Sequence, residues 1–409
     1  MLVTDADVLG LDEVGEPFEL VRLSELPLSP AELRTMTIIY DEVEFATAVK
    51  PSLLRLLIDR GADVAVYLDP DVEIFASLDE LVPVAEKDHV VLIPHILAPI
   101  PQDGLRPTAK DIAVAGVFNL GFIAVSRGAD DFLSWWASRL RRNCIVAIEE
   151  GLFVDQRLMD FAPGYFRHLV LRDPAYDVAY WNLHERDVTW AGQRYEVAGK
   201  PLRFFHYSGF EPLRPRELSK HQAARPRVLL EDRPGVARLC SAYATALLTA
   251  GYRDAIRIPY GFGTTASGEP LDLRTRRLYR ANVLAMESGA VLELPDPFEP
   301  AQSEVFASWV RSPDATEALP PLLRARLYLE AGPELASPKK WVPYARRLLL
   351  RVLRPSNQHQ HLVQEALIQA MESIEARLAE ALPVPAQPGA PQNTEAPQNV
   401  GGRADAGAR

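Results

Sequence analysis

The fold class of this chain is indicated by the stretch Val66-Tyr67-Leu68-Asp69-Pro70-Asp71-Val72-Glu73-Ile74-Phe75. Residues 63–68 predict a buried strand, and two carboxylates one residue apart follow it directly. Open α/β sheets bind ligands beyond the carboxyl ends of their strands, so Asp69 and Asp71 are expected at a binding site. Carboxylate oxygens bind hard cations such as Mn²⁺ and Mg²⁺, which keep coordination positions open for phosphates. The stretch therefore predicts a divalent-cation site that suits a diphosphate leaving group.

A second triplet of the same kind, Asp5-Ala6-Asp7, shows how weak the bare motif is. A pattern this short is expected about once by chance in a chain of this size. Asp5 and Asp7 have a lead-in of only three apolar residues, whereas Asp69 and Asp71 end a strand. A structural turn is the alternative for the second triplet, and its position at the end of a strand favours the ligand site.

Helix and strand patterns alternate around this stretch. Lys50-Pro51-Ser52 predicts a helix start and Gly61 a helix end. Further strands are expected at residues 89–94, 116–126 and 202–207, helices at 129–143 and 154–161, and a hairpin at 188–197. Residues 1–210 are therefore expected to form an α/β domain with a mixed sheet flanked by helices.

The remainder of the 409-residue chain is expected to be a helical extension and a tail. Helices are predicted at 234–250 and 271–288, within an extension that covers residues 211–338. The Gly- and Pro-rich loop at 258–270 is either a lid over an acceptor cleft or a plain connector. Residues 339–382 are predicted to form a basic amphipathic segment and a helix, and the proline-rich composition of residues 383–409 predicts disorder.

Composition narrows the class of protein. A net charge of −11 argues against non-specific nucleic-acid binding, which needs Lys and Arg to neutralise phosphates. The two cysteines, Cys144 and Cys240, provide neither a disulfide framework nor zinc-ligand spacing. The start of the chain lacks the pattern of a signal peptide, and no stretch is apolar for the roughly 18 residues that span a bilayer. We expect a cytoplasmic protein, with residues 339–354 either touching the inner membrane face or docking on the acidic body of the chain.

Three later segments place polar residues in apolar surroundings. Asn119 and Gly121 interrupt a strand, Asp155-Gln156 stands at a predicted helix start, and His206 ends an aromatic strand before Gly209. Each has a bland alternative: a bulge, a charge that favours the helix dipole, and a histidine that satisfies core hydrogen bonds. Taken with Asp69 and Asp71, they favour a sugar-binding site in which the amide and the carboxylate bind hydroxyl groups.

The order Asp69-Pro70-Asp71, Asn119-x-Gly121, Asp155-Gln156 and His206-x-x-Gly209 resembles the glycogenin-like GT-A glycosyltransferases over roughly residues 1–221. The strings Tyr180-Trp181-Asn182-Leu183-His184-Glu185-Arg186 and Leu218-Ser219-Lys220-His221-Gln222 resemble a bacterial branch of that group. The resemblance implies a GT-A (Rossmann-like) fold and a hexosyltransferase that retains the anomeric configuration. Its donor would be a nucleotide sugar, most simply a UDP-sugar, and its acceptor a glycan or a lipid-linked molecule.

The resemblance also assigns residues. Asp69, Asp71 and His206 would bind Mn²⁺ or Mg²⁺, and Asp155 and Gln156 would be catalytic. The donor would contact the positions Asn119, Gly121, Asp155, Gln156 and Gly209. Trp181, Asn182 and His184 are the candidates on the acceptor side.

The sequence departs from the glycogenin-like pattern in two places. After Gly209 that pattern has Lys-Pro-Trp, whose lysine contacts the donor diphosphate, whereas this chain reads Phe210-Glu211-Pro212-Leu213. Lys220 is the expected substitute. Leu2 to Asp5 resembles the second strand of these proteins, so a preceding strand and helix are expected upstream or have been lost. A non-catalytic scaffold that binds nucleotide sugars is the alternative. A sugar-nucleotide pyrophosphorylase is disfavoured, because it needs a Gly-rich phosphate loop near its start and none is visible here.

Overall fold

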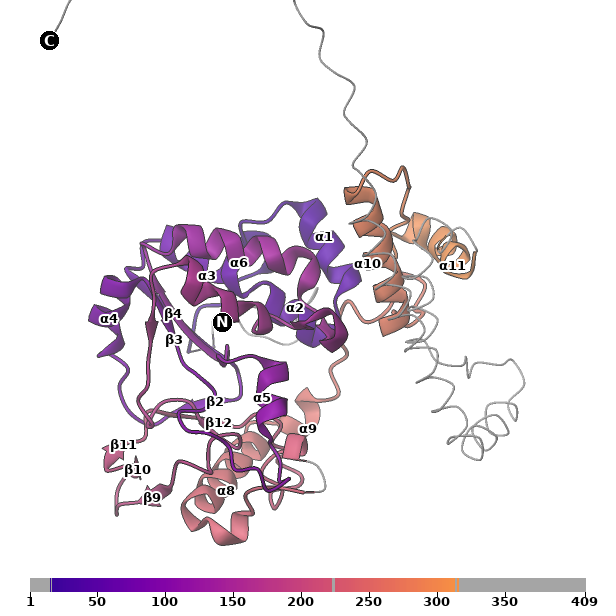
Figure 1. Ribbon diagram of the computed structural model, residues 1–409. Helices are drawn as coiled ribbons and strands as arrows, with labels where there is room; N and C mark the ends of the chain where they lie inside the picture. Colours follow the sequence, from indigo (N-terminus) through magenta and orange to yellow (C-terminus); the bar gives the residue numbers. More distant parts are fainter. Residues whose placement is uncertain (1–14, 16, 223–224, 313–314, 316–409) are drawn as a thin grey trace, which may run out of the picture. The chain divides into compact units, whose positions relative to one another are not determined.

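The strand predicted before the two carboxylates is present in the computed structural model (Figure 1), and its pairing places it at one edge of a sheet. The structure describes residues 15, 17–222, 225–312 and 315. These residues belong to a unit that ends at Leu319. Asp5, Asp7 and the segments predicted at 339–382 and 383–409 lie outside the described residues, and the boundary predicted at residue 210 falls inside this unit.

The main sheet is mixed, as the sequence predicted. Its strands, in the order β1-β4-β3-β7, are β1 (Val64–Leu68), β4 (Phe122–Ser126), β3 (Val90–Leu92) and β7 (Leu169–Val170). Strand β4 runs antiparallel to both of its neighbours, and β7 runs parallel to β3. The predicted strand at 116–126 forms only in its second half, because residues before Phe122 make a single bridge, Pro94 to Phe118, and then a turn.

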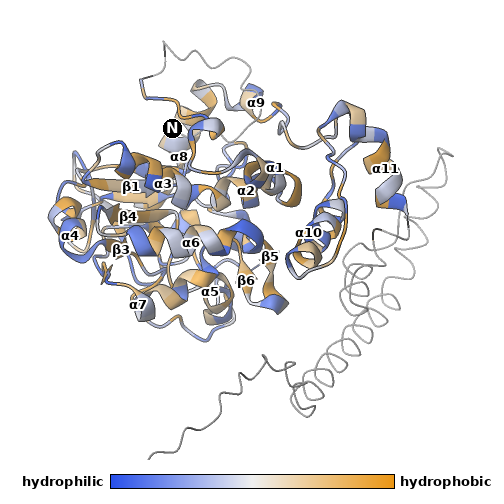
Figure 2. Ribbon diagram, turned by 90° about the horizontal axis from the view of Figure 1, so that it is seen from above, coloured by the Kyte–Doolittle hydropathy of each residue, from blue (hydrophilic) through white to orange (hydrophobic). Residues whose placement is uncertain are grey.

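Helices cover both faces of the main sheet. Ile123 and Val125 of β4 join the core beneath α3 (Lys50–Asp59) and α6 (Asp130–Asn143). The alternate residues Phe122 and Ala124 join the core beneath α4 (Leu81–Asp88). All five residues of β4 are buried, as expected for a strand covered on both faces, and Figure 2 shows apolar colouring along β3 and β4.

A second sheet continues from the first. Its order is β2-β12-β8, comprising β2 (Val72–Ile74), β12 (Phe204–His206) and β8 (Val178–Ala179). The predicted hairpin is present as β9 (Val188–Trp190) and β10 (Tyr195–Val197), with β11 (Lys200–Pro201) beside β10. Helix α8 (Pro234–Thr249) packs against β9 so closely that a Cβ on Gly235 would lie 1.9 Å from the Val188 carbonyl oxygen.

The predicted helix at 154–161 is wrong in its type and its start. Val154 has a φ of 43°, and its N–H donates to the Ile145 carbonyl after the short pair β5 (Val146–Ala147) and β6 (Leu152–Phe153). A left-handed residue cannot begin an α-helix, so the chain instead forms a 3₁₀-helix at Arg157–Phe161. Asp155 and Gln156 therefore lie in the turn between β6 and this 3₁₀-helix.

The remaining helices complete the unit. They are α1 (Pro30–Ile39), α2 (Glu42–Ala48), α5 (Ala109–Ala115), α7 (Ala162–Tyr165), α9 (Tyr252–Ala255), α10 (Leu273–Glu287) and α11 (Ser303–Arg311). Short 3₁₀ turns stand at Leu23–Glu25, Ile148–Glu150, Lys220–Gln222, Leu230–Asp232 and Pro300–Gln302. No helix among the described residues has both the length and the apolar character to cross a bilayer.

Buried arginines attach α10 to the N-terminal helices. One nitrogen of Arg276 donates to the carbonyls that end α1, including that of Tyr40 at 2.6 Å, and Arg277 pairs with the buried Glu44 of α2. The loop predicted as a lid or a connector also packs here, with Phe262 against Phe45 at 5.9 Å between ring centroids. None of its residues lines the cavity that contains Asp69, Asp71 and His206.

Candidate metal centre

The turn Asp69-Pro70-Asp71 joins the two sheets. The Asp69 N–H donates to the Gly121 carbonyl beside β4 at 2.9 Å, and the Tyr207 N–H donates to the Asp71 carbonyl at 2.9 Å. Strand β2 then pairs antiparallel with β12, and His206 stands opposite Val72. The pairing of β2 with β12 therefore carries His206 to the two aspartates from a distant part of the sequence.

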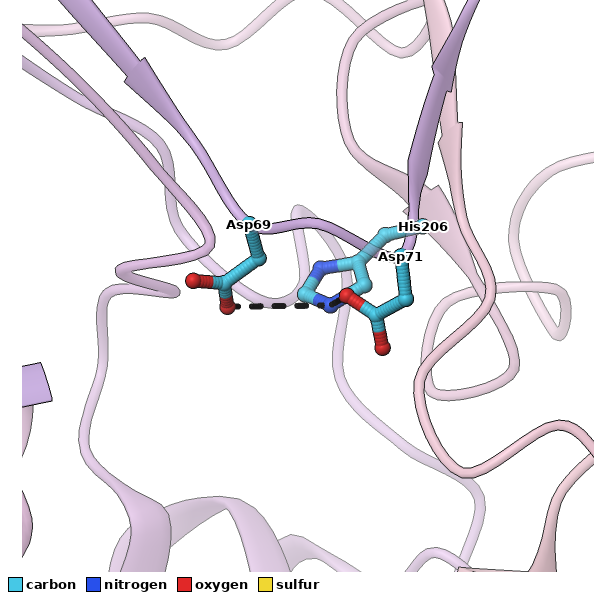
Figure 3. A group of neighbouring side chains, drawn as sticks. All are labelled: Asp69, Asp71 and His206. Atoms are coloured by element: carbon cyan, nitrogen blue, oxygen red, sulfur yellow. Dashed lines mark ion pairs between the residues drawn. The ribbon is translucent and has the colours of Figure 1, made fainter. Parts of the chain in front are cut away.

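The three side chains converge, as Figure 3 shows, with the aspartates following β1 and the histidine ending β12. The His206 Nε2 atom lies 3.1 Å from Asp71 Oδ1 and 3.9 Å from Asp69 Oδ2. One ligand atom from each residue lies within 4.8 Å of the others. Ligands bound at about 2.0–2.5 Å from one cation have separations of this size. Asp69, Asp71 and His206 thus form a group that could hold a metal ion.

Charge is concentrated around the imidazole of His206. Burial opposes its protonation, but the carboxylates of Asp177 and Asp71 outweigh burial and raise the pKa of His206 to about 10. Burial also raises the pKa of Asp71, but its contact with His206 has the larger combined effect, so this pKa lies below its usual value. A cation at this site must displace the proton from Nε2. The carboxylates that stabilise the protonated imidazole would then stabilise the positive charge of the cation.

Gly121 and Asn119 shape the wall beside His206. A Cβ on Gly121 would lie 2.3 Å from His206 Cε1, so only glycine allows the ring to pack on this backbone. The Asn119 Oδ1 atom accepts the Gly121 N–H at 3.0 Å, and its Nδ2 lies 3.3 Å from His95 Nε2. Burial lowers the pKa of His95 to about 4, so its neutral ring accepts from Asn119 and fixes the orientation of the amide.

Lys50 is the principal site residue that sequence reasoning missed. Its side chain is 2% exposed, and Nζ lies 3.1 Å from Asp69 Oδ1, 2.9 Å from Asp155 Oδ2 and 3.0 Å from the Leu120 carbonyl oxygen. Burial opposes the charge, yet Asp155 and Asp69 hold the pKa of Lys50 well above its usual value. The available signal was its place at the start of a helix, where a cation is unfavourable to the dipole.

These groups line a cavity of about 270 Å³. The predicted site residues in its wall are Asp69, Asp71, Asn119, Gly121, Asp155, Gln156, Trp181 and His206. Residues that were not predicted also line it, among them Lys50, Tyr180, His95, Asp111 and His221. Asp155 is 2% exposed; burial raises its pKa, and the Lys50 ammonium opposes that rise. The cavity can therefore bind a cation next to polar groups suited to hydroxyls.

Four predicted residues are not in the cavity wall. The buried amide of Asn182 holds the backbone by donating to the carbonyls of His95 and Asp177, and His184 Nε2 lies 3.4 Å from the Ala98 carbonyl oxygen. Gly209 accepts the Lys220 N–H at 2.9 Å, and the Lys220 residue is exposed. The neighbour of Lys220, His221, reaches the cavity instead. The roles predicted for these four residues remain predictions.

Comparison with known proteins gives one distant relative to report. The chain is 23% identical over 185 residues to a Bacillus subtilis (strain 168) protein described as uncharacterized protein YfnD. The alignment covers 43% of this chain and 57% of YfnD. No family model matches the sequence, and no solved structure matches it. The chain is thus similar over part of its length to YfnD, and this likeness assigns no family.

Proposed function

We propose that this chain is a metal-dependent glycosyltransferase with a GT-A-like fold. It would move a sugar, most simply a hexose, from a nucleoside-diphosphate sugar to a glycan or lipid-linked acceptor. One observation carries the proposal: the metal group and Asn119, Asp155 and Gln156 line the same cavity. The resemblance to glycogenin-like enzymes adds a UDP-sugar as donor and retention of the anomeric configuration.

The cation is the group that the donor requires. Asp69, Asp71 and His206 would hold Mn²⁺ or Mg²⁺, since two carboxylates and an imidazole supply the oxygen and nitrogen ligands that such ions accept. A bound cation of this kind would supply Lewis-acid stabilisation of the charge on a departing diphosphate. The geometry of the three side chains supports this part of the proposal.

Protein groups would orient the sugar. Asp155 and Gln156 lie in the turn after β6, and both line the cavity together with Gly121. The buried Lys50 ammonium contacts the carboxylates of both Asp155 and Asp69. It therefore sets the distance between Asp155, which would bind the sugar, and Asp69, which would bind the metal. Such fixed positioning is what a transfer reaction gains from its binding site.

Calorimetric titration with UDP tests the proposal. We expect UDP to bind with Mn²⁺ present and at least about tenfold more weakly with EDTA, because a diphosphate binds through the cation. The Asp71→Asn variant should lose the Mn²⁺-dependent part, while Asp5→Ala, from the other triplet, should keep it. Binding without turnover on a panel of nucleotide sugars would favour the non-catalytic scaffold. Failure of UDP and of every other nucleotide to bind would reject both functions.

A further inference from the structure

Asp177 is a buried carboxylate beside the metal group. It precedes β8, which pairs parallel with β12 and places Ala179 next to His206. Asp177 is 0% exposed, and neither carboxylate oxygen has a hydrogen-bond partner among the described residues. A buried carboxylate without hydrogen-bond partners is costly, so its position needs an explanation.

Asp177 faces the ring nitrogen of His206 that points away from the aspartates. The Asp177 Oδ1 atom lies 3.5 Å from His206 Nδ1, and that nitrogen has no hydrogen-bond partner within the described part of the chain. The other ring nitrogen, Nε2, faces Asp71. The rings of Trp181 and His206 lie nearly perpendicular, with 5.1 Å between their centroids, so Trp181 closes another side of the imidazole. The two nitrogens of His206 therefore face different carboxylates, Nε2 that of Asp71 and Nδ1 that of Asp177.

The backbone at Asp177 is held in an unusual conformation. Its φ is 51°, in the left-handed region, which is uncommon for residues other than glycine and is adopted mainly by asparagine, aspartate and histidine among them. Two buried groups bind its carbonyl oxygen: Asn182 Nδ2 at 2.8 Å and Arg186 Nη1 at 3.2 Å. Strain persists only where the surroundings fix it, and here the fixed backbone directs a carboxylate at His206.

We propose that Asp177 is a positioning residue of the metal centre, which closes the 3.5 Å gap to His206, accepts its Nδ1–H and so presents Nε2 to the cation. Asn182 and Arg186 support it by fixing the backbone from which its side chain projects. This inference rests on the metal site of the proposed function. Metal-binding histidines generally donate their second N–H to a carboxylate or a carbonyl, which fixes the tautomer and the ring orientation.

Metal affinity tests the role of Asp177. Asparagine has the same shape as aspartate and tolerates a positive φ, so the Asp177→Asn variant keeps the backbone while removing the charge. Loss of such a supporting carboxylate lowers metal affinity by roughly 10- to 100-fold, and we expect this fall for Mn²⁺ measured by electron paramagnetic resonance. Asp173→Asn is the matched control, because Asp173 binds the Ala175 N–H and Lys200 instead, and its Mn²⁺ affinity should be unchanged.

A spectroscopic readout separates positioning from general destabilisation. In full-length protein labelled with ¹⁵N-histidine, we expect a slowly exchanging Nδ1–H proton signal that disappears in His206→Gln and moves upfield in Asp177→Asn. This signal can be observed in the wild-type protein alone. Its absence would overturn the inference even if the Asp177→Asn variant did not fold.

The comparison with Asp71→Asn separates the two possible failures. Mn²⁺ affinity that falls in Asp71→Asn but stays within about twofold of wild type in Asp177→Asn would overturn the role of Asp177 and leave the metal centre intact. Wild-type protein that binds no Mn²⁺, or Asp71→Asn with full affinity, would reject the metal centre and this inference with it.

Discussion

Replacing Lys50 with methionine should destabilise the protein strongly, because Lys50 balances two carboxylates. Its Nζ lies 2.9 Å from Asp155 Oδ2 and 3.1 Å from Asp69 Oδ1. At an effective dielectric constant of about 20, each pair attracts by about 5 to 6 kcal/mol before desolvation is subtracted. Breaking a buried pair by removing one partner typically costs about 3 to 5 kcal/mol.

Protonation of Asp155 limits this cost. A carboxyl with a reference pKa of 3.8 takes up a proton at about 1.4 kcal/mol per pH unit, or about 4 kcal/mol at pH 7. We therefore expect Lys50→Met to lower the free energy of unfolding by about 3 to 4 kcal/mol at pH 7. The variant's folded state would hold a proton that its unfolded state releases above pH 4. Its stability should therefore rise as the pH falls from 7 to 5.

Urea denaturation at several pH values measures this effect. Lys87→Met, which removes an exposed lysine of α4, is the control and should change stability by less than about 0.5 kcal/mol. The double variant Lys50→Met/Asp155→Asn should recover at least about 1 kcal/mol, because asparagine is neutral at pH 7 without the cost of taking up a proton. The reasoning is refuted if Lys50→Met lies within about 1 kcal/mol of wild type at pH 7, or if its deficit does not shrink with acidification.

Further predictions concern the cavity and its supports. Gly121→Ala should weaken Mn²⁺ binding by roughly tenfold or more, since the new Cβ would collide with the His206 ring. Gly164→Ala, whose Cβ meets open space, is the control and should bind Mn²⁺ like wild type. Equal Mn²⁺ affinities of the two variants would contradict this. Mn²⁺ affinity should rise with pH between 6 and 9, because the cation displaces a proton from His206. Asp177 and Asp71 raise the pKa of His206 to about 10 despite burial. An affinity independent of pH would count against His206 as a ligand. Arg227→Gln should lower stability by about 1 to 3 kcal/mol and speed proteolysis within residues 101–107, because Arg227 donates to Asp103 and to the carbonyls of this loop; an unchanged cleavage rate would show that the loop is held by other contacts.

The local parts of the site could be predicted from the sequence. Asp69 and Asp71 follow a strand directly, so a hydrophobic run and its end were sufficient to place them. His206 is different: its own surroundings suggested a core histidine, and only the order of motifs associated it with the aspartates. The structure brings it there through the pairing of β2 and β12, strands of three residues each that leave little periodic signal.

Groups whose role depends on burial could not be predicted. Lys50 and Asp177 look like surface charges in the sequence, and they become buried only when α3 packs against β1 and β8 pairs with β12. The prediction of a helix at 154–161 was wrong for a related reason. The turn at Val154 is set by the hydrogen bond from its N–H to the Ile145 carbonyl rather than by local propensity. Tertiary contacts of this kind override single-sequence patterns.

Sugar transfer at this centre is tested most directly by following UDP release from a panel of UDP-sugars, with and without Mn²⁺. We predict release by wild-type protein that depends on Mn²⁺, persists in Asp5→Ala and is lost in Asp71→Asn, because a diphosphate leaves poorly when its developing charge is not neutralised. Release that continues at the wild-type rate in Asp71→Asn, or that is lost in Asp5→Ala instead, would contradict the assignment of the metal centre to Asp69, Asp71 and His206.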